Sequence, residues 1–341
     1  MSDPSAETSP AELYDTLHDE ITRVLVGNEG VVERMLYALL TNGHILLEGV
    51  PGIAKTLTAE SFARASGLTF NRIQMTPDVL PADVTGTTIY REATGEFEVQ
   101  RGPIFGNLIV ADEINRATPK TQSALLEAMG EQQVTIENNT YRLPELFLVI
   151  ATQNPIEMEG VYELPEAQRD RFQFKLQLSY PDTDAERTII DRFDAEPNLN
   201  PASIEQVVTT DEIKSARHTV ENVFIADPVK DYLLDIITAT RENTETEIGA
   251  SPRAALDLLN AAKAHAAVND RSYVIPDDVK QLSNDVLAHR LVLSTDTELS
   301  DRTASDIIDT ILETTDTPSA NITQTSSDEF SGKSLWSDDQ D

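Results

Sequence analysis

The sequence of 341 residues contains no cysteine, which excludes disulfides, thiolate metal sites and a cysteine nucleophile. It also lacks any apolar run close to the roughly 18 residues that a membrane-spanning helix needs. Residues 1–10 are polar and acidic, without the basic start and the apolar stretch of a secretion signal. The five histidines are scattered without the spacing of metal ligands. We therefore expect a cytoplasmic protein with no membrane span.

Basic residues are scarce as well. The 26 lysines and arginines (8 and 18) face 59 acids, and the formal net charge is −33. The acid is spread along the whole chain, which keeps a protein solvated in concentrated salt, where charge repulsion is screened. We therefore expect a halophilic host, in particular an archaeon. The alternative is an acidic partner-binding protein, although its charge would more often lie in blocks. In both cases no nucleic acid is expected as a partner, because it is bound largely through cationic contacts.

The composition otherwise supports a folded protein of two parts. An apolar content of 40% is enough for a core, and the length allows two domains or one domain with a smaller satellite. Strand and helix patterns alternate as far as Pro181, after which the pattern is helical. We predict a disordered N-terminus over 1–10, an α/β core over 11–181, an all-α unit over 182–293 and an acidic, largely disordered tail over 294–341.

Residues 45–56 predict a phosphate-binding loop. A short apolar run is followed by a loop rich in glycine and proline, and then by Lys55-Thr56 at the start of an apolar-periodic helix. In this context, backbone N–H groups and a helix N-terminus bind phosphate. Lys55 would reach the β- and γ-phosphates of ATP, and the Thr56 hydroxyl would hold Mg²⁺. The alternative is an ordinary turn before a helix.

The residues that we assign to ATP come from two places. Within the loop, Ala54 stands where the pattern has glycine, which is tolerable if its φ is negative. Upstream, a break between two amphipathic helices forms a turn of the kind that lies beside adenine in nucleotide-binding folds, although a plain helix–loop–helix explains it equally well. The predicted ATP-binding residues are Val26, Gly27, Gly49, Val50, Pro51, Gly52, Ile53, Ala54, Lys55 and Thr56.

Two further predicted strands end in polar side chains. The apolar strand at 108–111 is followed by Asp112 and Glu113, and the strand at 146–152 is followed by Asn154. The carboxyl ends of parallel strands form the ligand-binding edge of such a sheet. Asp112 would hold Mg²⁺ through its water shell, Glu113 would deprotonate the attacking water, and Asn154 would position that water. A pair of acids in a surface turn and a turn-forming asparagine before proline are the alternatives.

An arginine opens the main helix of the second unit. Ser251 suits the N-cap and Pro252 the first helical position. Arg253 then places a cation in the first turn, where the helix dipole disfavours it. Contact with a bound γ-phosphate would explain this arginine, and so would a plain surface position.

Several of these segments resemble the MoxR-type AAA+ ATPases, over about residues 20–293. Gly-Val-Pro-Gly-Ile-Ala-Lys-Thr (49–56), with alanine before the lysine, is the form of the loop that this family uses. Ala-Asp-Glu-Ile-Asn-Arg-Ala (111–117) resembles its Walker B segment, and Ala-Thr-Gln-Asn-Pro (151–155) resembles its sensor 1 strand. Glu-Gly-Val-Tyr-Glu-Leu-Pro-Glu-Ala-Gln (159–168) resembles the family's next block.

The resemblance implies a fold and two arginine roles. The fold is an α/β, P-loop AAA+ core, a parallel sheet with helices on both faces, with a helix-2 insert near 76–101 and a hairpin before sensor 1. A small all-α lid domain follows it. Arg253 would be the sensor 2 arginine, and Arg171 would be the arginine finger that reaches the ATP of a neighbour. Arg169 stands where an apolar residue is expected, so it is the alternative finger.

The resemblance also implies a function. This is a homo-oligomeric ring, a hexamer, that uses ATP and Mg²⁺ for chaperone-like remodelling or maturation of a client protein complex, with a von Willebrand factor A domain protein as partner. Three alternatives stay open. A DNA-translocating ring of the MCM type is disfavoured because the hairpin at 133–141 has no basic residue at its tip. A magnesium-chelatase motor subunit and a nucleotide-gated binding module with little turnover are the others.

Overall fold

The computed structural model describes residues 8–27, 29–50, 55–93, 95–154, 161–197 and 200–318. Some predictions fall outside these ranges. They concern the loop residues Pro51, Gly52, Ile53 and Ala54, the first seven residues of the chain, part of the block at 159–168, and the tail from Ser319 onward.

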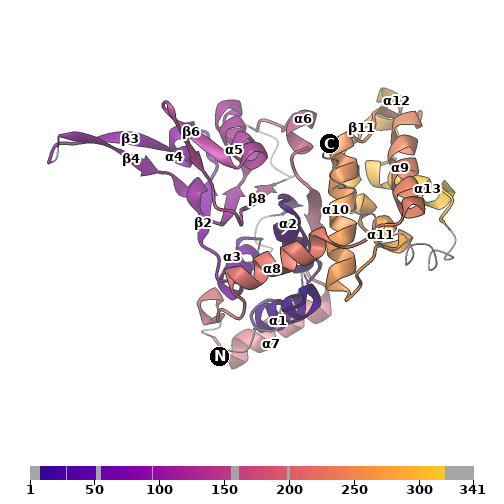
Figure 1. Cartoon of the computed structure of the whole chain (residues 1–341), viewed down its shortest axis with the longest axis horizontal. Helices are drawn as coiled ribbons and strands as arrows, with labels where there is room; N and C mark the ends of the chain where they lie inside the picture. Colours follow the sequence, from indigo (N-terminus) through magenta and orange to yellow (C-terminus); the bar gives the residue numbers. More distant parts are fainter. Residues whose placement is uncertain are drawn as a thin grey trace, which may run out of the picture.

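A five-stranded sheet lies at the centre of the molecule (Figure 1). It is parallel throughout, with the order β2-β5-β8-β1-β9. Its strands are β1 (Ile45–Gly49), β2 (Phe70–Gln74), β5 (Leu108–Asp112), β8 (Leu148–Gln153) and β9 (Phe174–Leu178). The three inner strands, β5, β8 and β1, are those recognised as apolar runs, because parallel strands are buried on both faces. The predicted α/β class with a parallel sheet is confirmed.

Helices cover both faces of this sheet. Alternate strand residues point to opposite faces, so Leu108 and Val110 of β5 join one apolar cluster while Ile109 and Ala111 join another. Helix α5 (Pro119–Glu131) contributes to the second cluster. The helices of the first cluster include α1 (Pro10–Thr22), α2 (Glu29–Thr41), α3 (Lys55–Ala65) and α8 (Thr210–Glu221).

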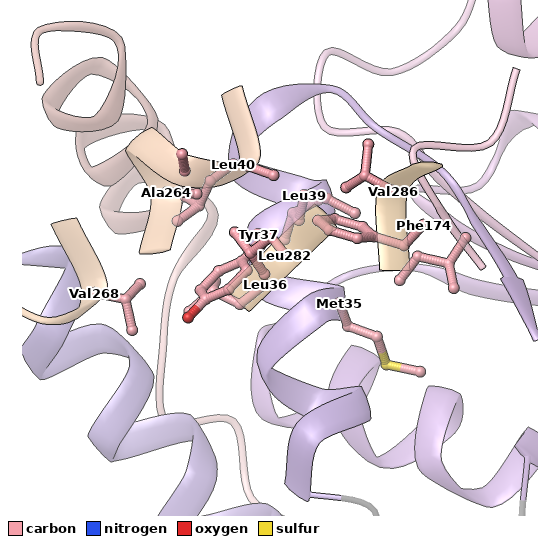
Figure 2. Close-up of a cluster of buried hydrophobic side chains, with 14 of the residues drawn as sticks. Met35, Leu36, Tyr37, Leu39, Leu40, Phe174, Ala264, Val268, Leu282 and Val286 are labelled. Atoms are coloured by element: carbon pink, nitrogen blue, oxygen red, sulfur yellow. The ribbon is translucent and has the colours of Figure 1, made fainter. Parts of the chain in front are cut away.

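Helix α2 connects the sheet to the helical C-terminal part. Its apolar side chains lie in one buried cluster with Phe174 of β9 and with side chains of two later helices, α10 (Pro252–Val268) and α11 (Pro276–Leu287) (Figure 2). The domain limits stay predictions, since this one apolar cluster includes residues before and after position 181. The C-terminal elements are α7 (Thr183–Ala195), α9 (Asp227–Glu242), α10 (Pro252–Val268), α11 (Pro276–Leu287), α12 (Thr295–Glu298) and α13 (Ala304–Thr314).

Two antiparallel hairpins are inserted in the core, one within the insert expected near 76–101 and one at the hairpin expected at 133–141. The first, β3 (Gly86–Arg91) with β4 (Glu96–Arg101), extends away from the sheet (Figure 1). The second pairs β6 (Gln133–Ile136) with β7 (Asn139–Arg142). A short helix before the first hairpin, α4 (Pro81–Thr85), was not predicted because five residues are too few to show a helical period.

The remaining short elements are α6 (Glu166–Arg169) and a small antiparallel pair, β10 (Thr246–Ile248) with β11 (Val292–Leu293), which was not predicted either. Among the described residues, no helix is both long enough and apolar enough to cross a membrane.

Candidate functional site

The carboxyl ends of β1, β5 and β8 meet at one edge of the sheet, together with the end of β2. The register pairs Gln74 of β2 with Asp112 of β5, and Ala111 of β5 with Ala151 of β8. Asp112, Glu113 and Asn154, which were predicted from separate stretches of sequence, therefore follow adjacent strands. Asp112 and Asn154 are both buried, at 9% and 6% exposure.

Lys55 lies at this edge, at the start of α3. Its Nζ donates to the carbonyl oxygen of Gly49 (2.7 Å) and to that of Gln153 (3.4 Å), so it bridges the ends of β1 and β8. Burial lowers the pKa of the Lys55 amine, and the nearby carboxylates of Asp112 and Glu113 oppose this shift. Within the described residues, this half-buried cation is bonded to neutral carbonyls, and such a cation is suited to receive an anion such as phosphate.

Asp112 is held on both of its oxygens. Oδ1 accepts a hydrogen bond from the Thr152 hydroxyl (2.6 Å), and Oδ2 accepts from Nη2 and Nε of Arg72 (2.5 and 3.2 Å). Thr152 fixes the carboxylate from β8, and Arg72 neutralises its charge from β2. A metal ion that approaches Asp112 would therefore share or replace the contact with Arg72.

Glu113 has an unusual backbone conformation. Its φ of 57° and ψ of 51° are in the left-handed region, which is uncommon for residues other than glycine. Its N–H donates to the Thr152 hydroxyl (2.9 Å), which helps to hold this conformation. The carboxylate accepts from Gln74 Nε2 (2.9 Å) and from Arg116 Nη1 (3.2 Å). The Glu113 carboxylate is thus held in a strained turn and paired within its own chain, and its role as the base stays a prediction.

Four residues of this edge could not be recognised in the sequence, namely Arg72, Gln74, Arg116 and Thr152. Arg72 and Gln74 are two residues apart on β2 and therefore share a face, and Arg72 Nη2 also donates to Gln74 Oε1 (3.1 Å). A pair of polar residues at the alternate positions 72 and 74 was the available signal. This polar pair could not be assigned to the site from the sequence, because the assignment depends on the pairing of β2 with β5.

The predicted adenine turn lies near a pocket at the end of β9. Val26 and Gly27 are half-buried, and Gly27 has a φ of +75°. They directly precede α2, whose first residues, with the end of β9 and Asp285 of α11, line a pocket of about 320 Å³. Because Leu178 of β9 is the register partner of Gly49, this pocket adjoins the start of the phosphate loop.

The candidate metal ligands have suitable chemistry. Thr56, half-buried in the first turn of α3, and Asp112 offer hydroxyl and carboxylate oxygens, which are the donors that Mg²⁺ prefers. No group of three or more metal-binding side chains occurs among the described residues. A site of few protein ligands, completed by water and phosphate, is the usual form for Mg²⁺ bound with a nucleotide.

The two candidate finger arginines lie at the end of α6 and two residues after it. Arg171 Nη1 donates to the carbonyl oxygen of Leu126 on α5 (2.6 Å). A Cβ on Gly130 would lie 2.5 Å from this nitrogen, so glycine is needed for the close approach. Arg169 is half-buried, and its Nε has no hydrogen-bond partner in the part of the chain that is described. Arg253 is exposed in the first turn of α10, as predicted.

Comparisons with known families agree with this arrangement. Residues 44–174 match the ATPase family associated with various cellular activities (AAA), and residues 238–311 match the AAA lid domain. The first match spans β1 to the start of β9 and so includes the sheet edge. The second includes α10 and α11.

Individual proteins are similar over most of their length. The chain is 46% identical to Chaperone MoxR1 of Mycobacterium tuberculosis over 311 residues, which are 89% of this chain and 81% of that protein. It is 43% identical to the uncharacterized protein YeaC of Bacillus subtilis, over 88% of this chain and 93% of that one. A crystal structure from Cytophaga hutchinsonii superimposes with a TM-score of 0.85 at 42% identity, covering 91% of this chain and 96% of the other.

Proposed function

Because the chain belongs to the MoxR family of AAA+ ATPases, we propose that it hydrolyses ATP to ADP and phosphate at the carboxyl edge of its sheet. The main observation in favour of this proposal is the position of the Lys55 amine. It bridges the ends of β1 and β8, and the nearby carboxylates of Asp112 and Glu113 act on its pKa. A phosphate-binding cation and a candidate base thus lie within one site.

Each residue has a role in this proposal. Lys55 and the backbone of residues 49–56 bind the phosphates, and Glu113 takes a proton from the attacking water. Asn154 positions that water. Arg253 contacts the γ-phosphate from the lid.

Mg²⁺ would be held by the Thr56 hydroxyl and, through water, by the Asp112 carboxylate. When bound, it neutralises charge on the phosphate oxygens. The Thr152 hydroxyl, 2.6 Å from Asp112, fixes the orientation of that carboxylate. Arg72 must give up or share its contact with Asp112, which it can do because half of its side chain is exposed.

We further propose that the active form is a ring, a hexamer, in which Arg171, or Arg169 in its place, reaches the ATP of the next copy. MoxR1 of Mycobacterium tuberculosis is named a chaperone, which supports remodelling or maturation of a protein complex as the output. A partner with a von Willebrand factor A domain, a cytoplasmic location and a halophilic archaeal host belong to the same proposal. The net charge of −33 is the observation in favour of the host.

The test is ATP turnover as a function of protein concentration, in molar KCl with Mg²⁺. The wild-type chain should turn over ATP, with a specific activity that rises with concentration if sites are completed between copies. Glu113→Gln should keep ATP binding and lose on the order of 10²- to 10⁴-fold in turnover. The matched control is Glu127→Gln, which changes an exposed acid on α5 and should behave as wild type. Turnover by Glu113→Gln near the wild-type rate would contradict the assignment of the base.

A nucleotide-gated binding module with little turnover is the second candidate. It is favoured by the hydrogen bonds of Glu113 to Gln74 and Arg116, which engage the base within its own chain. Tight ATP binding by the wild-type chain with no turnover at any protein concentration would support this candidate instead.

A further inference from the structure

The segment Arg169-Asp170-Arg171 is bonded to both parts of the molecule. Arg171 is bonded to α5 of the core through the Leu126 carbonyl. Asp170 faces the lid, where its Oδ1 accepts a hydrogen bond from the Ser251 hydroxyl (2.9 Å). Ser251 is the N-cap of α10, and its Oγ also accepts from the Ala254 N–H (3.2 Å). One hydroxyl therefore links this segment to the first turn of the helix that carries Arg253.

Arg290, which follows α11, forms a second link. Its side chain is only 1% exposed, and Nη2 donates to the Phe172 carbonyl (2.7 Å) and to Asp257 Oδ2 (2.5 Å). Its Nε lies 3.5 Å from Asp170 Oδ1. Asp257 is four residues after Arg253 and so lies one turn further along the same side of α10. A single buried guanidinium thus joins residues 170–172 to the lid helix.

These two links make the contact between the segment and α10 stiff. A guanidinium without access to water cannot exchange its carboxylate and carbonyl partners for solvent, so separating them leaves charges unpaired. Burial raises the pKa of Asp257, and the adjacent Arg290 opposes this shift. The acids on both sides of the junction, Asp170 and Asp257, share this one cation.

We propose that Asp170 and Arg290 are positioning residues that couple the arginine segment 169–171 to α10, so that the two move as one unit when nucleotide binds. The inference rests on the proposed function, in which Arg253 meets the nucleotide of its own chain and Arg171 or Arg169 meets that of the next copy. Through this coupling, the nucleotide in one site sets the position of an arginine that serves the neighbouring site.

Amide hydrogen exchange with and without saturating MgATP tests the coupling, in chains that carry Glu113→Gln so that ATP persists. ATP should slow the exchange of residues 165–172 by about tenfold. Ser251→Asp keeps an acceptor for the helix N-cap but places a carboxylate against Asp170, and should abolish this slowing. Asp170→Asn removes the charge shared with Arg290 and should do the same. Ser251→Thr retains the hydroxyl and should match the parent, which excludes a general loss of structure as the cause.

An equal ATP-dependent slowing in Ser251→Asp and Ser251→Thr would overturn the proposal, and so would the absence of any slowing in the parent. The measurement needs bound ATP but neither turnover nor a neighbouring copy. Failure of the coupling is therefore distinct from failure of the proposed function, which would show as absent turnover in the wild-type chain.

Discussion

Two arginine–carboxylate pairs of the molecule differ in their access to water. At the sheet edge, Arg72 donates to Asp112 at 2.5 Å, and its side chain is 50% exposed. At the junction of core and lid, Arg290 donates to Asp257 at the same distance, and its side chain is 1% exposed. The two contacts have similar geometry, but only the Arg72 guanidinium can move into solvent.

The difference shows which charges can change partners during function. The half-exposed Arg72 guanidinium is already partly hydrated, so it can release Asp112 to a metal ion that takes over the carboxylate's charge. A buried pair costs far more to break, because each ion then lacks both its partner and water. A carboxylate that must meet a metal ion needs an arginine partner that can move into solvent, as Arg72 can. A junction that transmits movement needs a buried arginine, as Arg290 is.

The largest expected effect comes from removing the buried cation. Arg290→Met should lower the free energy of unfolding by about 3 kcal/mol, because Asp257 and the Phe172 carbonyl both lose their donor. Urea unfolding in molar KCl measures this. The matched variant is Arg72→Met, which should lose less, because no buried guanidinium is removed and Asp112 keeps the hydrogen bond from the Thr152 hydroxyl. Equal losses in the two variants would remove the distinction between the pairs.

The second prediction concerns His44, another group that cannot reach water. Its Nδ1 accepts from the Val149 N–H (3.1 Å), and its Nε2 lies 3.3 Å from the Met129 carbonyl. Burial lowers the pKa of His44 from 6.5 to about 4. As the pH drops below 6.5, the unfolded chain therefore binds a proton at this histidine before the folded chain does. His44 thus lowers the free energy of unfolding between pH 6.5 and about 4 and has no effect on it above 6.5.

The expected contribution of His44 across this window is on the order of 3 kcal/mol. His44→Gln is neutral at every pH, so its unfolding free energy should fall less steeply between pH 6.5 and 4 than that of the wild-type chain. The difference between the two slopes separates His44 from the carboxylates that protonate in the same range. Parallel slopes would show that His44 is not held neutral.

The smallest expected effect is at the sheet edge. Because Arg72 and Mg²⁺ compete for Asp112, Arg72→Gln should lower the Mg²⁺ concentration for half-maximal ATP binding by up to about fivefold. Titration calorimetry of ATP binding at increasing Mg²⁺ measures this without requiring turnover. Arg64→Gln removes an arginine on α3 that is paired with Glu60. It should leave the Mg²⁺ concentration for half-maximal ATP binding unchanged. A higher Mg²⁺ requirement in Arg72→Gln would mean that Arg72 supports the metal site rather than competing with it.

The parts of the site that could be predicted are those that the local sequence pattern determines. Strands β1, β5 and β8 are buried on both faces and so appear as apolar runs, and their polar ends follow directly in sequence. Lys55, Asp112 and Glu113 could therefore be assigned to one edge from the amino-acid sequence alone. The lid helices could also be predicted from local pattern, because their apolar residues recur at helical spacing.

The residues that hold these groups could not be predicted in this way. Gln74 reaches Glu113 only because β2 pairs with β5 in a particular register, which brings together residues 39 positions apart. Arg290 and Asp170 meet across 120 positions. Such contacts depend on tertiary packing, so an arginine that anchors a junction and one that lies on the surface look alike in the sequence.

In the proposed function, ATP is hydrolysed at sites to which a neighbouring copy contributes an arginine. The most direct measurement mixes two variants that should each be inactive alone: Glu113→Gln, and the double variant Arg169→Ala/Arg171→Ala. A 1:1 mixture should recover roughly a quarter of the wild-type turnover, because in a random head-to-tail ring about one site in four combines an intact Glu113 with an arginine from its neighbour. A mixture as inactive as its two components would contradict the claim.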